Sequence, residues 1–335
     1  MSFLRSPSGV IPYLPITSPR TLRNCSSLPL ERGDVFITSY PKSGTTWTQW
    51  IVLSLILTAK QQSTDNSSSR DPIVIDHVGD YAPFYEIDPH WDATGTQMTA
   101  DIQQRQQHLG RRVFNTHLRF ELLPHLQSAT SDKAALNSTA MSGPKFIYLV
   151  RHPLDTCLSF YHHLSSQGEG TYTKSFGHFF DEWMNGTIYF GSWLDHLLSY
   201  AKGVANGEKD VLVLEYERMV HDLPRCVNQI CRHLELELTD EIIEDELLPT
   251  FSFSYMKSHK SKFQPRSVGW LHEYEFLRKG IVGDSTSKDG LVTQAMRDAF
   301  RQRVEESDYT KRIQDIFAGS EFQEEAEIFL KVVRI

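Results

Sequence analysis

The stretch Tyr40-Pro-Lys-Ser-Gly-Thr-Thr-Trp47 lies between a largely apolar run, Asp34–Thr38, and a second apolar run, Trp50–Leu57. We interpret these three segments as a strand, a tight turn and a helix. A turn that opens a helix directs several unpaired backbone N–H groups, and the positive end of the helix dipole, at one position. Gly44 lets a ligand approach the backbone closely, and Lys42 adds a positive charge. The stretch therefore predicts a binding site for an anion such as a phosphate group.

This turn differs from the Walker A pattern of nucleoside triphosphatases, GxxxxGK[ST]. In that pattern the lysine directly follows a glycine, whereas Lys42 stands two residues before Gly44. A nucleoside triphosphate with Mg²⁺ is therefore not the expected ligand. Because a Ser-Gly-Thr-Thr turn also occurs as a purely structural turn, the prediction needs support from other segments.

The chain has 335 residues, of which 40% are hydrophobic and 23% charged, as in ordinary soluble globular proteins. We expect one large domain at residues 31–335, preceded by an N-terminal extension at residues 1–30. The formal net charge of −8 argues against a nucleic-acid partner and against an anionic membrane, because both need a basic surface. An anionic ligand must then be held by a local cluster of basic side chains.

The N-terminal segment Met1–Ser18 contains three prolines and no sustained apolar core, so it does not match a secretory signal. The apolar run Trp50–Ala59 is too short to span a bilayer. We therefore predict a cytoplasmic protein without membrane insertion. The cysteines have neither CxxC spacing nor histidines at metal-site spacing, so we expect buried, reduced thiols and no bound metal. They are Cys25, Cys157, Cys226 and Cys231.

Continuous apolar runs alternate with helical patterns, which is typical of strands that are covered on both faces. The expected strands are Val35–Thr38, Arg112–Asn115, Phe146–Val150 and Val211–Glu215. The expected helices are Trp47–Ala59, Pro153–His163 and Leu223–Leu234. The alternation predicts a single α/β domain in which helices flank a central parallel sheet, with ligands at the carboxyl ends of the strands. Lys42 and Arg151 both fall at such ends.

Three other segments contribute to the expected outline of the domain. The polar stretches Gln61–Asp71 and Gln127–Gly143 are rich in Ser, Thr, Asn and Gly, as surface loops are. The charged segment Gln294–Val333 has apolar residues at helical spacing, and we interpret it as an outer helical layer.

Two further segments carry basic residues where an anion can bind. Arg151 directly follows the strand Phe146–Val150, and Ser159 lies about two turns into the next helix. The other segment is Leu277-Arg-Lys-Gly280. Alone, each is common as a surface arginine or a helix end, so the ordered combination with the first turn carries the prediction.

Together these segments resemble the cytosolic sulfotransferase family over the range Asp34–Gly283. The resemblance implies 3′-phosphoadenosine 5′-phosphosulfate (PAPS) as the donor co-substrate and no metal. Tyr40–Trp47 is similar to the family's P-loop-like 5′-phosphosulfate loop, and Arg151 with Ser159 is similar to its 3′-phosphate site. Arg278–Gly280 is similar to its closing motif. Two separate phosphate sites imply a nucleotide with two phosphate groups.

The same resemblance implies that Trp47, Tyr216 and Phe253 contact the adenine, and their rings suit the face of a purine. For Tyr216 and Phe253, plain core packing is the alternative. Phe251 stands where the family usually has Thr, whereas the next serine is retained. The donor-binding residues implied by the resemblance are Lys42, Ser43, Gly44, Thr45, Thr46, Trp47, Arg151, Ser159, Tyr216, Ser252, Phe253, Met256, Leu277, Arg278, Lys279 and Gly280.

Sulfonate transfer needs a base that takes a proton from the acceptor, and histidine suits this task near neutral pH. Of the 14 histidines, His117 follows an expected strand, and Asn115-Thr-His-Leu118 resembles the family's Lys-Thr-His-Leu catalytic segment, with asparagine in place of lysine. By this resemblance His117 is the general base and Lys42 stabilises the charge on the leaving group. Ser159 holds Lys42 away from the sulfonate until the acceptor arrives. Without the resemblance, a lone histidine is more often structural.

The segment Asp80–Glu86 resembles the family's acceptor-pocket segment, and its aromatic residues, with Phe120 and Phe160, are expected to line an apolar cavity. A small-molecule acceptor with a hydroxyl or amine group follows, such as a sterol, a phenol or an aliphatic alcohol. For Phe84 and Phe160 individually, core packing is the alternative. The implied acceptor-binding residues are Asn115, Thr116, His117, Phe84 and Phe160.

The oligomeric state stays open at this point. The family's usual dimer segment is altered here, with Arg297 where a glutamate is usual, so the chain is a monomer or a homodimer.

The function also has alternatives to the first interpretation, a sulfotransferase. A nucleoside or small-molecule kinase is a second interpretation, and it predicts Mg²⁺ dependence and a Walker lysine. A nucleotide-binding regulator without turnover is a third, and the presence of His117 and Lys42 argues against it.

Overall fold

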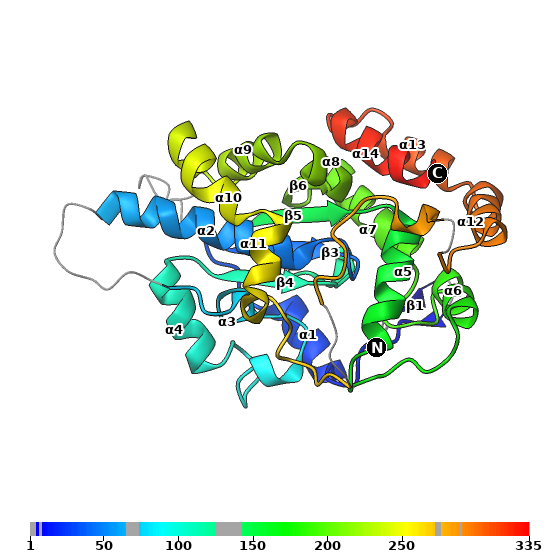
Figure 1. Ribbon diagram of the computed structural model, residues 1–335, viewed down its shortest axis with the longest axis horizontal. Coiled ribbons are helices and arrows are strands. Elements are labelled where there is room, and N and C mark those ends of the chain that lie inside the picture. Colours follow the sequence, from blue (N-terminus) through cyan, green and yellow to red (C-terminus); the bar gives the residue numbers. More distant parts are fainter. Residues whose placement is uncertain are drawn as a thin grey trace.

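The computed structural model describes residues 5–6, 9–64, 74–124, 143–271, 276–287 and 290–334. Within these residues the main sheet has four parallel strands in the order β4-β3-β5-β6 (Figure 1). They are β3 (Val35–Ser39), β4 (Val113–Thr116), β5 (Lys145–Val150) and β6 (Asp210–Glu215). A short antiparallel pair, β1 (Arg5–Ser6) and β2 (Gly9–Val10), lies outside this sheet. The predicted α/β class with a central parallel sheet is confirmed.

The strand predictions are confirmed, with ends that differ by a residue. β4 begins at Val113 rather than Arg112, whose guanidinium forms an ion pair with Asp34 at 2.5 Å. The register pairs Val35 of β3 with Val113 on one side and with Lys145 on the other. All the strands therefore point their carboxyl ends to the same edge of the sheet.

Successive strand residues face opposite sides, so the sheet separates two apolar cores. Phe36, Phe114 and Phe146 belong to one core and stack on one another, whereas Ile37 and Ile147 belong to the other. Helices on the Phe36 side supply buried residues to the first core. They are α1 (Pro19–Ser27), α5 (Pro153–Leu164), α6 (Phe176–Asn185), α7 (Trp193–Ala205), α12 (Gln294–Glu306), α13 (Tyr309–Phe317) and α14 (Gln323–Val333).

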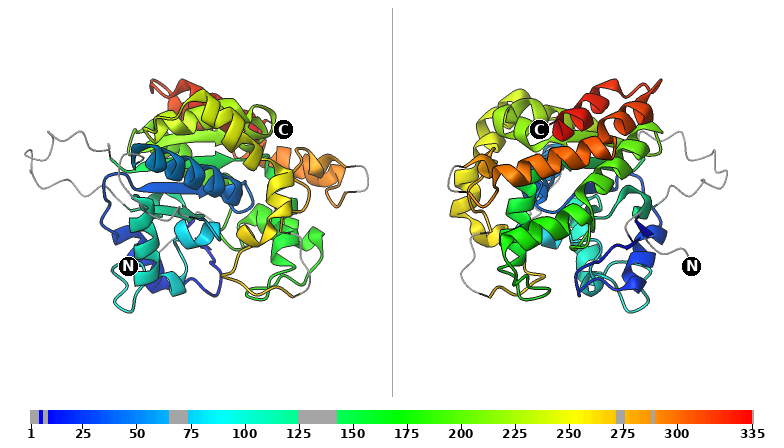
Figure 2. Two further views of the ribbon diagram at one scale, coloured as in Figure 1. Left: turned by 60° about the vertical axis from the view of Figure 1, so that its left-hand side comes forward. Right: turned by 90° about the vertical axis from the view of Figure 1, so that its right-hand side faces the viewer.

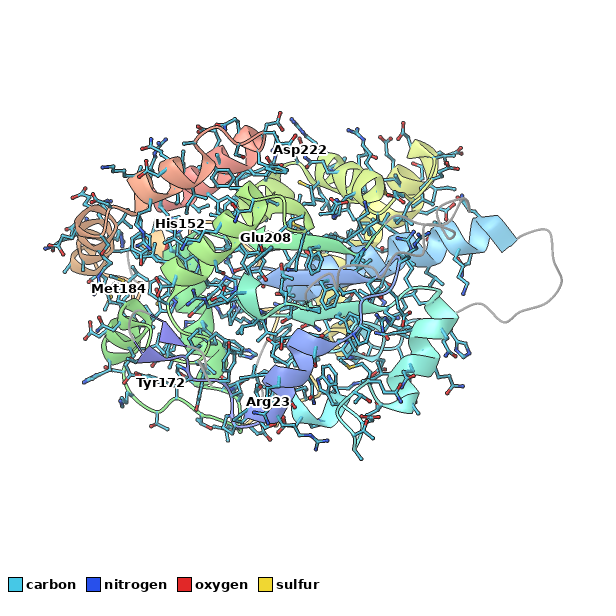
Figure 3. The ribbon with its side chains drawn as sticks, turned by 180° about the vertical axis from the view of Figure 1, so that it is seen from behind. Arg23, His152, Tyr172, Met184, Glu208 and Asp222 are labelled. Atoms are coloured by element: carbon cyan, nitrogen blue, oxygen red, sulfur yellow. The ribbon has the colours of Figure 1, made fainter. Side chains whose placement is uncertain are left out.

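Helices on the opposite side fill the second core. The long helix α2 (Thr45–Thr64) starts directly after the turn at Gly44, and residues 51–55 are all buried because the helix is apolar nearly all round. Asp222, labelled in Figure 3, caps the helix α9 (Leu223–His233) by accepting a hydrogen bond from the backbone N–H of Arg225. The other helices here are α3 (Val78–Tyr81), α8 (Tyr216–His221), α10 (Leu248–Thr250) and α11 (Phe253–Ser258), while α4 (Ala100–Leu109) lies against α2 and α3. A π-helix spans Ile242–Leu247, and short 3₁₀ turns span Asp88–His90, Phe120–Leu122, Lys260–Lys262 and Asp284–Thr286.

Two expectations about the outline of the domain were wrong in part. The first concerns the polar stretches that were expected to be surface loops. Residues 61–64 belong to the last turn of α2, because this helix continues past its apolar stretch. The rest of the two stretches, residues 65–71 and 127–142, lies outside the described residues. The C-terminal helices α12, α13 and α14, which lie together in Figure 2, are more than an outer layer. Phe300, Ile313 and Phe329 are completely buried, and Phe329 stacks on Tyr148 of β5.

The cysteines are buried and form no disulfide, as predicted for Cys25, Cys157, Cys226 and Cys231. Among the described residues, no cluster of His, Cys, Asp and Glu is arranged to hold a metal ion. No helix in the described ranges is long and apolar enough to cross a membrane.

Candidate functional site

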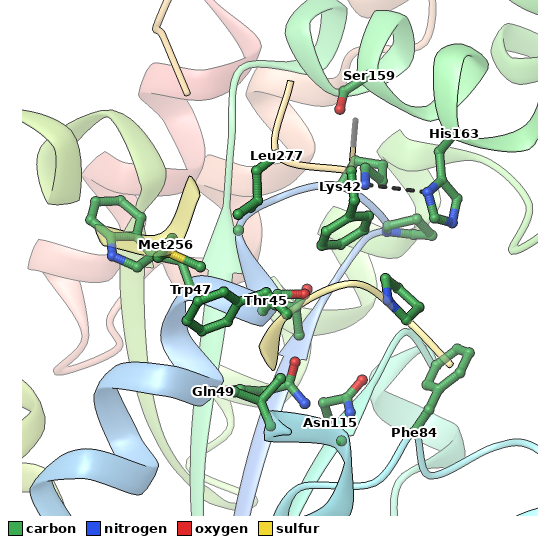
Figure 4. A pocket seen from close by; sticks show the side chains of 18 of the residues that line it. Lys42, Thr45, Trp47, Gln49, Phe84, Asn115, Ser159, His163, Met256 and Leu277 are labelled. Carbon is green, nitrogen blue, oxygen red and sulfur yellow. Dashed lines mark hydrogen bonds between the residues drawn. The ribbon is translucent and has the colours of Figure 1, made fainter. Parts of the chain in front are cut away.

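A cavity of about 720 Å³ opens at the carboxyl ends of the strands. Lys42, His117, Arg151 and Tyr216 each come shortly after one of the strands β3, β4, β5 and β6, and all of them line it. Lys42 is labelled in Figure 4. In the order of the sheet these residues run His117, Lys42, Arg151, Tyr216. The sheet topology therefore brings together side chains that are far apart in the sequence.

The turn between β3 and α2 has the backbone conformation that an anion site needs. Gly44 has φ of 105°, and a Cβ atom there would lie 2.8 Å from Cδ2 of Tyr216. Lys42 also has a positive φ, 70°, which is uncommon for a residue with a side chain. The tight turn packs against the Tyr216 ring, and α2 begins at Thr45 with its first N–H groups at the cavity.

Arg151 joins this turn to the ring of Tyr216. Its Nη1 donates a hydrogen bond to the carbonyl of Lys42 at 2.9 Å, and its guanidinium lies 4.4 Å from the centroid of the Tyr216 ring. Trp47 completes the wall, because its ring meets Tyr216 edge-on at 5.9 Å and its Nε1 donates to the carbonyl of Phe251 at 2.8 Å. These aromatic residues form a surface against which a flat ring system can lie.

The segment Leu277–Gly280 reaches the same cavity from far along the chain. Arg278 and Lys279 both form ion pairs with the buried Asp284, and the Asp155 carboxylate of α5 accepts hydrogen bonds from the N–H groups of Gly283 (2.7 Å) and Ser285 (2.8 Å). The ring of Phe253 covers the Cα side of Gly280, so that a Cβ there would collide with it. Leu277, Arg278, Lys279 and Gly280 all line the cavity.

Lys42 is the most perturbed cation of the site. Burial, together with the charges of Arg151 and Arg278, lowers the pKa of Lys42 to about 7. Its Nζ lies 3.4 Å from Nδ1 of His163 and 4.1 Å from the centroid of the Phe276 ring. Ser159 lines the cavity nearby (Figure 4), but in the described structure no hydrogen bond joins it to Lys42.

One buried polar atom of these cations, Nε of Arg151, has no hydrogen-bond partner in the described structure. Buried polar groups normally find a partner, and several cations brought together repel one another unless an anion lies among them. We call Lys42, Arg151, Arg278 and Lys279 the basic end of the cavity. Its side chains fit a ligand with more than one negative charge.

His117 also lines the cavity, close enough to Lys42 to be affected by its charge. Its Nδ1 lies 2.9 Å from the carbonyl of Ser39, and since a carbonyl only accepts, Nδ1 carries the proton and the lone pair is on Nε2. Its backbone N–H donates to the carboxylate of Glu86 at 2.6 Å. Burial and the charge of Lys42 lower the pKa of His117 to about 4, although the bond to Ser39 opposes them. At neutral pH the imidazole is therefore uncharged and can accept a proton.

Aromatic side chains surround His117. Phe84 and Phe190 meet its ring edge-on at centroid distances of 5.3 and 5.5 Å, and Phe160 packs edge-on against Tyr40 at 5.9 Å. We call Phe84, Phe160 and Phe190, with His117, the aromatic end of the cavity. It offers apolar walls around one polar group, as small-molecule sites do.

Asn115 lines the floor of the cavity, and its Nδ2 donates to the carbonyl of Ala82 at 2.7 Å, as does Nε2 of Gln49. Thr116 is completely buried, does not line the cavity, and accepts a hydrogen bond from the N–H of Leu118. The expectation that Phe120 lines the cavity was wrong. Its 3₁₀ turn places it in the core, edge-on to Tyr200 at 5.5 Å.

Most of the predicted site residues thus share one cavity, including Thr45, Thr46, Ser252, Phe253 and Met256. Ser43 is buried beside it, and its hydroxyl does not reach the surface of the cavity. Sequence reasoning missed His163, Phe190, Phe276 and Glu86. For His163 a signal existed, because it lies four residues after Ser159 on a helix and so shares its face. The aromatic residues carried no local pattern.

Comparisons with known proteins agree with this geometry. Residues 32–310 match the family model described as "Sulfotransferase domain". The chain is 33% identical over 275 residues to "Sulfotransferase 2A1" of Macaca fascicularis, covering 82% of this chain and 83% of that one. It is 26% identical over 270 residues to "Amine sulfotransferase" of Oryctolagus cuniculus, covering 79% and 78%.

Solved structures with the same fold include mouse sulfotransferase SULT7A1 complexed with PAP, with a TM-score of 0.58, 22% identity and coverage of 90% of this chain and 96% of that one. Retinol dehydratase in a complex with retinol and PAP has a TM-score of 0.59 and 20% identity, covering 91% and 88%. The chain belongs to the sulfotransferase domain family. The predicted family is confirmed, and so, at the level of the family, is the prediction of a sulfotransferase enzyme.

Proposed function

We propose that this member of the family transfers a sulfonate group from PAPS to a hydroxyl or amine group of a small, mainly apolar acceptor. The observation that carries the proposal is the cavity itself, in which the turn after β3, the arginine after β5 and the segment Leu277–Gly280 meet beside His117. The relatives named as sulfotransferases and the neighbours with bound PAP support it.

In this proposal the basic end and the aromatic wall beside it hold the donor. The N–H groups of the turn, with the hydroxyls of Thr45 and Thr46, bind the 5′-phosphosulfate, while Ser43 supports the turn from within. The 3′-phosphate lies between the Arg151–Ser159 side and the Arg278–Lys279 side. Residues around Tyr216 hold the adenine, namely Trp47, Ser252, Phe253, Met256 and Leu277, with Gly280 under the Phe253 ring.

His117 acts as the general base through Nε2. As this nitrogen takes the proton of the acceptor group, the acceptor oxygen or nitrogen forms a bond to sulfur, and the bond from sulfur to the bridging oxygen breaks. The electron pair stays on that oxygen, and adenosine 3′,5′-bisphosphate (PAP) leaves. The bond from Nδ1 to the Ser39 carbonyl keeps the ring in the required tautomer.

Lys42 stabilises the negative charge that grows on the bridging oxygen. Its pKa of about 7 reflects burial and two neighbouring arginines, and a bound polyanion cancels the effect of those arginines. The lysine is then fully charged when the leaving group needs it. Ser159, at the same edge of the cavity, restrains this lysine until the acceptor arrives.

The aromatic end holds the acceptor. Phe84, Phe160 and Asn115 line it, and Thr116 supports the position of His117 from below. Such walls suit a sterol, a phenol or an aliphatic alcohol better than a charged molecule. We further propose a sulfotransferase domain at residues 31–335 after an extension at residues 1–30, no metal requirement, and action in the cytoplasm.

The test is to mix the purified protein with PAPS and a panel of phenols, sterols, aliphatic alcohols and amines, and to follow the release of PAP. Transfer to at least one acceptor class is expected, with no need for Mg²⁺. His117→Ala should lower kcat at least about 100-fold. PAP binding should stay near the wild-type value, because His117 lies outside the basic end.

His178→Ala is the matched control, since His178 is exposed on α6 and hydrogen-bonded only to its own helix cap, Ser175, in the described structure. It should behave as the wild type does. Turnover of MgATP instead of PAPS would support the kinase interpretation, and PAP binding without turnover on any acceptor would support the regulator. Equal loss of PAP binding in the alanine variants of His117 and Arg278 would contradict the division of roles.

A further inference from the structure

We propose that His163 is a positioning residue that holds Lys42 beside the Phe276 ring until the donor's phosphosulfate draws the lysine toward the bridging oxygen. This inference rests on the proposed function and adds a residue that sequence reasoning did not identify. To the proposed restraint by Ser159 it adds a hydrogen bond from Lys42 to the imidazole of His163.

The contact between these residues is direct. Nζ of Lys42 lies 3.4 Å from Nδ1 of His163, as the dashed line in Figure 4 shows. A lysine ammonium has only donors, so Nδ1 must be the acceptor, and a neutral ring then carries its proton on Nε2. Ser159, one turn earlier on α5, makes no hydrogen bond with Lys42 in the described structure.

The ring of His163 packs against two aromatic rings, which also contact each other. It meets Trp270 edge-on at a centroid distance of 5.3 Å and Phe276 at 5.9 Å. Phe276 also lies under the Lys42 ammonium, 4.1 Å from its centroid. His163 and Phe276 thus form a pocket for a cation, with a ring nitrogen on one side and an aromatic face on another.

The charges of the site explain why the side chain of Lys42 points toward His163 and Phe276. Arg151 and Arg278 repel the Lys42 ammonium, and this repulsion, after burial, is part of the reason that the pKa of Lys42 falls. Burial, and after it the charge of Lys42, keep the pKa of His163 well below its usual range, so the ring stays neutral and Nδ1 can accept the hydrogen bond of Lys42. A dianionic group between the arginines reverses the balance and attracts Lys42 to the bridging oxygen.

This arrangement gives the enzyme a way to limit the loss of its donor. When Lys42 reaches the bridging oxygen, water can attack the sulfur, the bond from sulfur to that oxygen breaks, and the products are sulfate, PAP and a proton released to solvent. A lysine that is partly retained by His163 reaches the oxygen less often. Removing the imidazole nitrogen should therefore increase cleavage of PAPS in the absence of an acceptor.

Two substitutions separate the hydrogen bond from the ring contacts. His163→Phe keeps an aromatic ring against Trp270 and Phe276 but has no acceptor atom, whereas His163→Asn keeps an acceptor near the position of Nδ1 but has no ring. We expect His163→Phe to hydrolyse PAPS about three- to tenfold faster than the wild type without an acceptor, the range expected for one lost hydrogen bond. His163→Asn should stay close to the wild type.

The matched control is His162→Leu, because His162 is the neighbouring residue of α5 but does not line the cavity. It should leave the hydrolysis rate unchanged. The opposite pattern, with His163→Phe like the wild type and His163→Asn destabilised, would mean that the ring only packs, and it would overturn the inference. So would equal hydrolysis rates in all variants that bind PAP. A wild-type protein that neither binds PAP nor cleaves PAPS would instead refute the proposed function.

Discussion

The basic end and the aromatic end of the cavity are built in different ways. At the basic end, Lys42 and Arg151 come directly from the turns after strands, and Arg278 comes from one short motif. At the aromatic end, Phe84, Phe160 and Phe190 come from three segments that share no pattern in the sequence. The residues of the basic end can therefore be recognised from short sequence motifs, whereas the three aromatic residues are brought together only by the tertiary fold.

The difference follows from the chemistry of each ligand group. Phosphate is recognised by backbone N–H groups and fixed charges, which demand particular residues at particular spacings. An apolar surface is recognised by shape and area, which many combinations of side chains can supply. In the proposed function, the basic end therefore tolerates little change, whereas the aromatic end can vary and is expected to determine which acceptor is used.

Among the tests of this comparison, the largest expected effect on PAP binding comes from removing one cation of the basic end. Arg278→Ala should weaken PAP binding about 10- to 100-fold, because a hydrogen bond to a charged group contributes roughly 1.5–3 kcal/mol. Arg266→Ala is the matched control. Arg266 also lines the cavity, but it is exposed and paired with Asp80 at 3.5 Å, so PAP binding should change by no more than about twofold.

Calorimetric titration with PAP measures both values. The comparison between the ends breaks down if Arg266→Ala weakens PAP binding as much as Arg278→Ala does. PAP binding would then depend on positive charge anywhere around the cavity and not on the charge of the segment Leu277–Gly280 in particular.

The sequence predicted the parts of the molecule that depend on local chemistry. The strands, the anion turn and the position of His117 follow from runs and motifs only a few residues long, and the structure places them as expected at one edge of the sheet. The contact between Lys42 and His163 depends on the distance between the β3–α2 turn and α5, which no local pattern reports. Phe120 illustrates the same limit, because it was expected to line the cavity with Phe160 but the chain turns it into the core.

A second prediction concerns the pH dependence of the basic end. With a pKa of about 7, Lys42 is charged below neutral pH and loses its proton above it. Because a dianion binds the protonated lysine, PAP binding should be constant just below pH 7 and weaken above it, by at most about tenfold per pH unit. Calorimetric titrations with PAP at pH 8, in two buffers with different ionisation enthalpies, should show that the protein takes up a proton when PAP binds.

Lys42→Met is the control for this slope. It should bind PAP more weakly at pH 7 but show little further loss up to pH 9. Burial also raises the pKa of Glu86 to about 8, so this carboxyl titrates in the same range, under His117. A slope that persists in Lys42→Met would assign the effect to Glu86 and would place the pH sensitivity at the aromatic end.

The smallest expected effect tests the aromatic end. Phe84→Leu removes the ring that meets His117 edge-on, and it should raise the KM for an aromatic acceptor about two- to tenfold, since such ring pairs contribute roughly 0.5–1.5 kcal/mol. The Kd for PAP should not change. Steady-state kinetics with one phenol and one aliphatic alcohol check the result, and the phenol should lose more.

Phe120→Leu is the matched change in a residue that is near His117 in sequence but lies in the core. It should lower the free energy of unfolding by about 1 kcal/mol and leave the acceptor KM unchanged. If Phe120→Leu altered the acceptor KM and Phe84→Leu did not, proximity in sequence would describe the aromatic end better than the folded cavity does. The acceptor preference then could not be attributed to the walls that Phe84 and Phe190 form around the base.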